Sequence, residues 1–132
     1  MIRLVIFDLD GTLLDTLEDI ADACNYALNE CGFPSRNLEE YRRFVGRGIM
    51  NLCKDAIPQD MYSDELAQKV YSQFIPYYKE HICDKTRPYD GIYAMLDRLS
   101  EAGISFAVAS NSHTLPRFVC VSSSFSDSRP LK

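Results

Sequence analysis

The sequence predicts an α/β fold in which a small parallel sheet is interrupted by a long helical insertion. Two short apolar segments, Leu4–Phe7 and Ile104–Ala109, are each followed by polar residues. Between them, over about residues 17–82, apolar residues recur at three- and four-residue steps, which is the spacing of amphipathic helices. An unbroken apolar run favours a parallel strand buried on both faces, because a strand covered on one face alternates with polar residues. We therefore expect both segments to be buried strands of one sheet.

The end of the first apolar segment carries two carboxylates and a glycine. Asp8, Asp10 and Gly11 follow closely after Phe7, although Asp and Gly both disfavour strands. Ligands of open α/β sheets bind at the carboxyl ends of the strands. A turn held by side-chain hydrogen bonds of the aspartates is the structural alternative. We interpret the cluster as a functional site, because the rest of the chain fits the same architecture.

The insertion contains four predicted helices. They begin after Thr16, at Asn37, near Ile49 and after Ser63. Pro76 lies within the fourth helical pattern and is expected to kink or end that helix, because proline has no backbone N–H to donate. Ordinary crossover helices are the alternative interpretation, but four helices in succession are more than one crossover needs.

The second apolar segment also ends in residues that can contact a ligand. The pattern over residues 92–99 predicts a helix, which Gly103 ends before the strand begins. Ser110 and Asn111 follow that strand. A right-handed crossover places both strands in one sheet, with their carboxyl ends at the same edge. A Ser-Asn pair after a strand usually belongs to a loop, but beside the aspartates it predicts the second part of a site.

The composition is that of an ordinary globular chain. The 132 residues include 14 Lys and Arg against 19 Asp and Glu, for a net charge of −5. This balance argues against general binding of nucleic acids or anionic membranes, and no apolar stretch is long enough to span a bilayer. Five cysteines are an odd number without the spacing of metal ligands, which indicates a reducing cytoplasm.

Two motifs and the insertion between them resemble one known family. Asp8–Thr12 (DLDGT) after a strand resembles motif I of the haloacid dehalogenase-like (HAD) superfamily, specifically its phosphatases. Ser110-Asn111 resembles motif II, and the helical insertion resembles the cap that many of these phosphatases carry after motif I. The place of the cap and the glycine-flanked loop at Arg47 are most similar to the phosphoglycolate phosphatase subgroup. The resemblance covers about residues 2–116 and implies a HAD-type, Rossmann-like parallel-sheet core.

On this resemblance the chain divides into three parts. Residues 1–15 and 83–116 would form the α/β core, and residues 16–82 would form the all-helical cap. Residues 117–132 depart from the family pattern, and five serines in the seven residues 122–128 indicate an atypical tail. The basic residue of motif III and the acidic residues of motif IV have no convincing match. We therefore expect the first half of the core only, through a truncation or a frame change.

The resemblance also implies roles for the motif residues. Asp8 would attack phosphorus and form an aspartyl-phosphate, and Asp10 would protonate the leaving alkoxide and then activate water. Mg²⁺ is the implied cofactor, held by the Asp8 carboxylate and the Asp10 backbone carbonyl. The residues implied to bind the phosphoryl group or the substrate are Gly11, Thr12, Ser110, Asn111 and Arg47. The resulting prediction is Mg²⁺-dependent hydrolysis of a small phosphorylated metabolite similar to phosphoglycolate.

Several alternatives stay open on the sequence. The chain could be a catalytically impaired remnant, or a phosphate- or metal-binding module that needs a partner. Phosphonatase-like relatives use a Schiff-base lysine from the cap, for which Lys54 is the nearest candidate. Asp15 has either a helix-start role or a substrate contact, and Arg47 fits a solvated cation equally well. Two strands with unpaired edges also favour self-association.

Overall fold

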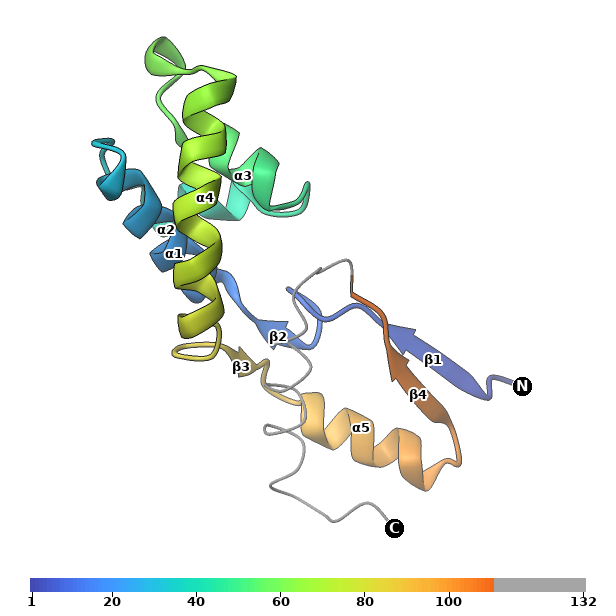
Figure 1. Ribbon diagram of the computed structural model, residues 1–132. Coiled ribbons are helices and arrows are strands. Elements are labelled where there is room, and N and C mark those ends of the chain that lie inside the picture. The colour runs from blue at the N-terminus through green and yellow to red at the C-terminus, as the bar shows by residue number, and fades with distance from the viewer. Residues whose placement is uncertain (111–132) are drawn as a thin grey trace. The chain divides into compact units, whose positions relative to one another are not determined.

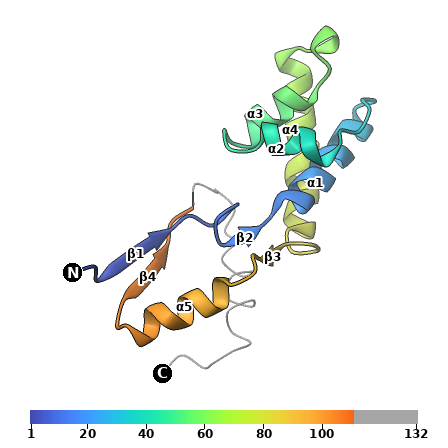
Figure 2. The ribbon, with the colours of Figure 1, turned by 180° about the vertical axis from the view of Figure 1, so that it is seen from behind.

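The chain divides into two compact units. Unit 1 contains Met1–Thr16 and the chain from Thr86 onward, and unit 2 is the continuous segment Leu17–Lys85. Unit 2 is thus inserted into the sequence of unit 1, as Figure 1 and Figure 2 show from opposite sides. The computed structural model describes residues 1–110, so Asn111 and the predicted tail over residues 117–132 lie outside the described part.

Unit 1 contains a two-stranded parallel sheet. β1 (Leu4–Phe7) pairs with β4 (Ser105–Val108), and Phe7 lies opposite Val108 in this register. α5 (Ile92–Glu101) precedes β4 along the chain. The pairing of the two apolar segments in one parallel sheet is therefore confirmed. β4 is shorter by one residue at each end than the strand predicted from the apolar run.

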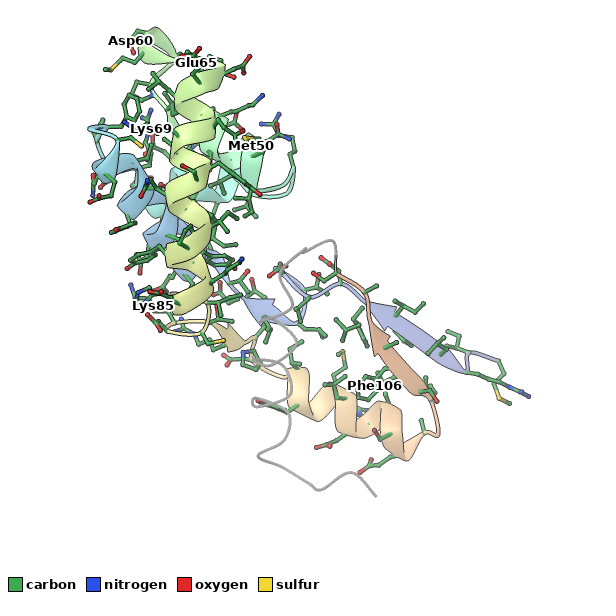
Figure 3. All side chains as sticks on the ribbon, viewed as in Figure 1. Met50, Asp60, Glu65, Lys69, Lys85 and Phe106 are labelled. Carbon is green, nitrogen blue, oxygen red and sulfur yellow. The ribbon has the colours of Figure 1, made fainter. Side chains whose placement is uncertain are left out.

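The expectation that both strands are buried on both faces is wrong for the described part of the chain. Leu4 and Ile6, on one face of β1, have exposed fractions of 53% and 62%. Phe7 and Val108, in contrast, pack against a buried cluster of leucines. α5 packs against β4, and Figure 3 shows Phe106 of β4 beside that helix. Successive side chains of a strand point to opposite faces, so a helix on one side of a sheet shields only every second residue. An apolar run therefore predicts the strand, but it does not predict which faces of the strand are buried.

A second, very small sheet lies in unit 1 next to both unit boundaries. β2 (Leu14–Asp15) pairs antiparallel with β3 (Arg87–Pro88), and Asp15 lies opposite Arg87. The sequence did not predict this pair, because a strand pattern needs about four residues or more to be recognised. The pair joins the segment that leaves unit 1 to the segment that returns to it.

Unit 2 is helical, and its four predicted helices are confirmed. Its elements are α1 (Leu17–Glu30), α2 (Leu38–Phe44), α3 (Ile49–Ala56), the 3₁₀ turn η1 (Gln59–Met61) and α4 (Asp64–His81). α2 begins at a capping box, in which Asn37 and Glu40 each accept the other's backbone N–H at 2.9 Å. No helix within residues 1–110 has both the length and the apolar composition to cross a membrane.

Helix α4 continues through Pro76 to His81, so Pro76 does not end this helix, and the kink expected there stays a prediction. Proline lacks the N–H that would donate to the carbonyl four residues earlier. On either side of Pro76, the buried rings of Phe74 and Tyr78 pack with their centroids 5.1 Å apart. Most helical stability in proteins comes from the packing of a buried face, and here that packing offsets the missing hydrogen bond.

Candidate active site

The residues that follow β1 form a closed turn, which we call the site turn and define as residues 8–14. The backbone carbonyl of Leu9 accepts hydrogen bonds from the N–H groups of Leu13 and Leu14, both at 3.0 Å. The N–H of Gly11 donates to the carbonyl of Leu14 at 2.9 Å. Backbone hydrogen bonds therefore hold the site turn in one conformation.

Gly11 has a backbone conformation that favours glycine. Its φ angle is +73°, in the left-handed region that other residues rarely adopt. A Cβ atom added at this position would meet no heavy atom within 4 Å, so the requirement is conformational and not steric. The tight turn expected at Gly11 is observed, and the contact of Gly11 with a phosphoryl group stays a prediction.

Three buried leucines anchor the site turn. Leu9, Leu13 and Leu14 have exposed fractions of 3%, 1% and 2%, and they pack with Phe7, Ile92, Met95 and Val108. Burial of a leucine side chain typically contributes about 1.5–3 kcal/mol. Asp8 and Thr12 lie on the same turn and are exposed. The apolar residues thus fix the backbone from which these polar side chains extend.

Asp8 lies beside the end of β4. The N–H of Ala109 donates to the carbonyl of Phe7 at 2.8 Å, just beyond the paired residues of the two strands. Asp8 and Ser110 are the residues that follow this hydrogen bond on neighbouring strands, and both are exposed. The sheet thus brings together the two segments that resemble motifs I and II.

Asp10 belongs to the site turn but is half-buried. Its backbone forms an isolated bridge with Leu14, and its Oδ1 atom is shielded from solvent. The two aspartates therefore differ in environment, although they are two residues apart. The side chain of Asp8 is exposed, whereas one carboxylate oxygen of Asp10 is buried.

Arg47 lies in unit 2, in the loop between α2 and α3. Its guanidinium is exposed and forms an ion pair with Asp55 of α3. The backbone carbonyl of Arg47 accepts a hydrogen bond from the side chain of Asn51 at 2.6 Å. These contacts hold the loop against α3, and the substrate contact of Arg47 stays a prediction.

Two further candidates from the sequence have ordinary structural contacts. The Nζ atom of Lys54 lies 3.5 Å from Oδ1 of Asp64, and both side chains are exposed. The hydrogen bond from the Tyr62 hydroxyl is the largest cause that lowers the pKa of Asp64 below its usual value, and the positive charge of Lys54 is the second. Nothing in this environment favours a Schiff-base role for Lys54. Asp15 lies in β2 and not at the start of α1, which begins at Leu17.

The donors of the site turn suit a hard cation. Carboxylate and carbonyl oxygens are the ligands that Mg²⁺ takes in proteins, and Asp8 and Asp10 offer both kinds. Within residues 1–110, however, no group of three or more His, Cys, Asp or Glu side chains could hold a metal ion. The described residues therefore fit Mg²⁺ in chemistry but provide only part of a coordination shell.

One buried acid that the sequence did not single out lies at the start of α1. Asp19 is 3% exposed, and both of its carboxylate oxygens accept the backbone N–H of Lys85, at 3.0 and 3.1 Å. Acidic residues are common in the first turn of a helix because the helix dipole favours negative charge there. The partner lies 66 residues further along the chain, so no local signal could identify it.

Comparisons with known proteins agree with this geometry. The family model for haloacid dehalogenase-like hydrolases matches residues 5–116. A phosphoglycolate phosphatase from Agrobacterium fabrum is 36% identical over 112 residues, which cover 82% of this chain and 47% of that protein. The crystal structure of a candidate phosphoglycolate phosphatase from Lactobacillus delbrueckii subsp. bulgaricus has a TM-score of 0.82 at 30% identity, covering 93% of this chain and 60% of that one. A predicted phosphoglycolate phosphatase from Haemophilus somnus has a TM-score of 0.75 at 29% identity, covering 86% and 53%.

The matched region includes both strand ends of the candidate site and the helical unit between them. The chain spans about half the length of the curated relatives it matches. On this evidence, the chain belongs to the haloacid dehalogenase-like hydrolase family.

Proposed function

We propose that this chain acts as an Mg²⁺-dependent phosphatase on a small phosphorylated metabolite similar to phosphoglycolate. The observation that carries the proposal is the position of Asp8 next to Ser110, at the ends of two paired parallel strands. This position offers an exposed carboxylate and a hydroxyl donor at one edge of the sheet. The names of the related phosphoglycolate phosphatases support a small phosphate monoester as the substrate class.

In the first step, a carboxylate oxygen of Asp8 forms a bond to phosphorus while the ester bond between phosphorus and the alcohol oxygen breaks. The products are an aspartyl-phosphate on Asp8 and an alkoxide that needs a proton. Asp10 donates that proton, a contribution typically worth about 10²–10⁴-fold in rate. The site turn supports this pairing of roles because it carries both carboxyl groups on one short, hydrogen-bonded segment.

In the second step, the carboxylate of Asp10 takes a proton from water while the water oxygen forms a bond to phosphorus. The bond between phosphorus and the Asp8 oxygen breaks, which releases inorganic phosphate and restores the Asp8 carboxylate. Asp10 ends this step protonated and ready for the next ester. The two steps consume one ester and one water molecule.

The remaining site residues would bind and orient the phosphoryl group. The hydroxyl of Ser110, together with Asn111, would donate to the phosphoryl oxygens. Gly11 and Thr12 already donate their N–H groups within the site turn, so their main contribution would be to hold its shape. Asp8 and Asp10 would hold Mg²⁺, which would supply positive charge between the carboxylates and the phosphate.

Unit 2 is proposed to act as a cap that contributes to substrate choice, with Arg47 as its contact. Arg47 is an exposed cation between Gly46 and Gly48, both of which have positive φ angles. An arginine guanidinium binds carboxylates and phosphates through charge-assisted hydrogen bonds. Asp55 would have to release the guanidinium, or share it, when an anionic substrate binds.

A non-catalytic function is the second candidate. The chain spans about half the length of its curated relatives, and residues 1–110 contain no group of three or more His, Cys, Asp or Glu side chains that could hold a metal ion. On this reading the chain binds phosphate and metal but needs a partner polypeptide for turnover. The exposed face of β1 at Leu4 and Ile6 is consistent with self-association or with such a partner.

The deciding experiment measures release of inorganic phosphate from 2-phosphoglycolate and from p-nitrophenyl phosphate in the presence of Mg²⁺. Asp8→Asn is expected to abolish turnover, and Asp10→Asn to reduce it about 10²–10⁴-fold. Asp97→Asn, which removes an exposed carboxylate from α5, is the matched control and is expected to leave turnover unchanged. Turnover that persists in Asp8→Asn would contradict the mechanism.

The second candidate predicts a different set of results. The wild-type chain would show no turnover, but Mg²⁺ with inorganic phosphate would raise its melting temperature, because a ligand that binds only the folded state stabilises it. Asp8→Asn would remove this shift, and Asp97→Asn would keep it.

A further inference from the structure

The core of unit 2 contains two free thiols that the proposed mechanism does not use. Cys24 of α1 and Cys53 of α3 both have an exposed fraction of 0%, and a hydrogen bond joins their side chains. A single buried cysteine usually acts as a small apolar residue. Two thiols in direct contact differ from it, because each sulfur has a bonding partner within the core.

Hydrogen bonds hold α1 and α3 together beside the two thiols. Oδ1 of Asn25, the neighbour of Cys24, accepts the backbone N–H of Arg36 at 2.8 Å, and the side-chain amide of Asn25 donates to the carbonyl of Arg36 at 3.0 Å. The Nε atom of Arg36 donates to the carbonyl of Ala56, the last residue of α3, at 2.8 Å. The hydroxyl of the buried Tyr41 in α2 also donates to Oδ1 of Asn25, at 2.7 Å. The fold therefore keeps the two sulfur atoms in contact.

The two thiols differ in acidity. Their hydrogen bond is the largest influence on the pKa of Cys24 and lowers it below the ordinary thiol value, although burial opposes this effect. The same hydrogen bond, together with burial, raises the pKa of Cys53. The thiolate is the reactive form of cysteine. Cys24 is therefore the nucleophile of the pair, and Cys53 is the thiol that keeps its proton.

We propose that Cys24 and Cys53 form a redox switch, in which a peroxide such as hydrogen peroxide oxidises the two thiols to a disulfide between α1 and α3. The Cys24 sulfur attacks one peroxide oxygen, the O–O bond breaks, and the hydroxide that leaves becomes water with the proton of Cys24. The Cys53 sulfur then bonds to the Cys24 sulfur, the S–O bond breaks, and a second water leaves with the proton of Cys53.

The disulfide is expected to act on the loop that carries Arg47. Bond formation draws the two sulfur atoms together, and with them α3 toward α1. α3 holds this loop through the ion pair of Asp55 with Arg47 and through the hydrogen bond of Asn51 to the Arg47 carbonyl. Oxidation therefore shifts the loop from within unit 2. The inference goes beyond the proposed function and holds whether or not the chain is catalytic.

The test treats the folded chain with hydrogen peroxide, blocks the remaining thiols with iodoacetamide and analyses the tryptic peptides by mass spectrometry. Trypsin releases Cys24 and Cys31 on one peptide, residues 4–36, and Cys53 on another, residues 48–54. A joined pair of these peptides is expected, lighter by two hydrogen atoms than the separate peptides and lost after dithiothreitol. Absence of the joined pair from the folded wild type would overturn the proposal.

Cys31→Ser is the matched control, because Cys31 is half-buried and lies on the same peptide as Cys24. The joined pair should persist in Cys31→Ser, where only Cys24 remains to form it, and should be absent from Cys24→Ala and Cys53→Ala. If either alanine variant does not fold, Cys31→Ser alone decides which thiol is linked. Loss of the joined pair in Cys31→Ser would overturn the proposal.

Oxidation in urea shows whether the fold selects the pair. In the unfolded chain Cys31 should take about half or more of the links to Cys53, because it closes a shorter loop than Cys24 does. In the folded wild type Cys24 should take nearly all of them, as fragment masses of the joined peptides will show. The same distribution in both states would overturn the proposal.

The effect on the loop is measured by NMR. The amide signals of Gly46 and Gly48 should shift on oxidation and return after dithiothreitol, whereas that of Gly11 in unit 1 should not move. Methionine sulfoxide needs dedicated reductases, so the return of the signals separates the disulfide from oxidised methionine. Unmoved signals of Gly46 and Gly48 in a chain that carries the disulfide would overturn the switch.

Discussion

The backbone N–H of Ala109 donates a 2.8 Å hydrogen bond to the carbonyl of Phe7, and this bond sets the end of β4 beside the end of β1. The next residues on the two strands are Ser110 and Asp8. A ligand that contacts both side chains must lie at this edge of the sheet, where parallel α/β sheets bind their ligands.

Ser110→Ala should lower kcat/KM for 2-phosphoglycolate by about 10²–10³-fold, because one donor to the phosphoryl oxygens is lost. Ser110 is exposed, so the free energy of unfolding should stay unchanged. Ser110→Thr keeps a hydroxyl and should recover most of the activity. Steady-state kinetics on the three proteins provide the measurement, and equal activity of Ser110→Ala and wild type would contradict the proposed contact.

Gly11→Ala should destabilise the site turn by about 1–2 kcal/mol, because alanine is strained at a φ of +73°. The added methyl group meets no atom within 4 Å, so no clash adds to this cost. Gly11→Asn is the informative comparison, since asparagine tolerates the left-handed region better than alanine. Urea unfolding should rank the stabilities as Gly, then Asn, then Ala, and an equal effect of the two substitutions would argue against a conformational cause.

Leu13→Ala should destabilise unit 1 by about 2–5 kcal/mol, the usual cost of removing a buried leucine side chain. Leu13 is 1% exposed and belongs to the cluster that anchors the site turn. Leu4→Ala removes the same atoms at a position that is 53% exposed and should cost about 0.5 kcal/mol or less. Denaturant unfolding of both variants measures the difference, and similar losses would mean that Leu4 is covered in solution.

Arg47→Ala should raise KM for 2-phosphoglycolate with little change in kcat, the pattern expected when a contact binds substrate and transition state equally. Asp55→Asn should lower KM slightly, because it frees the guanidinium that Asp55 now holds. Arg47 is exposed and Asp55 is partly exposed, so stability should change little in either variant. An unaltered KM in Arg47→Ala would show that Arg47 does not contact the substrate.

Asp64 should stabilise unit 2 at neutral pH but not in acid. The Tyr62 hydroxyl, 2.6 Å away, and then Lys54 lower the pKa of Asp64 in the folded state below the ordinary value of 3.8. A lowered folded pKa means that the stabilisation is present above the unfolded pKa and is lost as pH falls through the folded pKa.

The measurement for Asp64 is the difference in unfolding free energy between wild type and Asp64→Asn as a function of pH. The difference should favour wild type at neutral pH and shrink below about pH 4, near the ordinary carboxyl pKa. When both proteins also carry Tyr62→Phe, the difference in unfolding free energy should vary less with pH. A difference that does not vary with pH would show that the contact with Tyr62 does not act on the carboxylate.

Elements with a long repeating pattern could be predicted from the sequence. α1 has 14 residues and α4 has 18, so their apolar spacing is repeated often enough to be recognised. The start of α2 could be predicted from Asn37 and Glu40 because the two residues are only three positions apart and each accepts the backbone N–H of the other. The site turn was recognisable because its residue types and their spacing occur together within five positions.

Elements that depend on distant partners could not be predicted in this way. The two-residue strands β2 and β3 exist because they pair with each other across more than seventy positions. Burial of β1 was expected from its apolar run, yet Leu4 and Ile6 are exposed in the described structure. Pro76 was expected to disturb α4, and the packing of the buried face around it carries the helix to His81.

The helices, the strand that precedes Asp8 and the family of the chain could all be predicted from the order of the residues. These features depend on residue spacing within one element, where each residue meets neighbours a few positions away. Three other features are seen only in the folded chain: the hydrogen bond from Ala109 to Phe7, the hydrogen bonds from Lys85 to Asp19, and the exposure of one face of β1. Hydrogen bonds and packing between distant segments depend on how the whole chain folds, and no local pattern of residues encodes them.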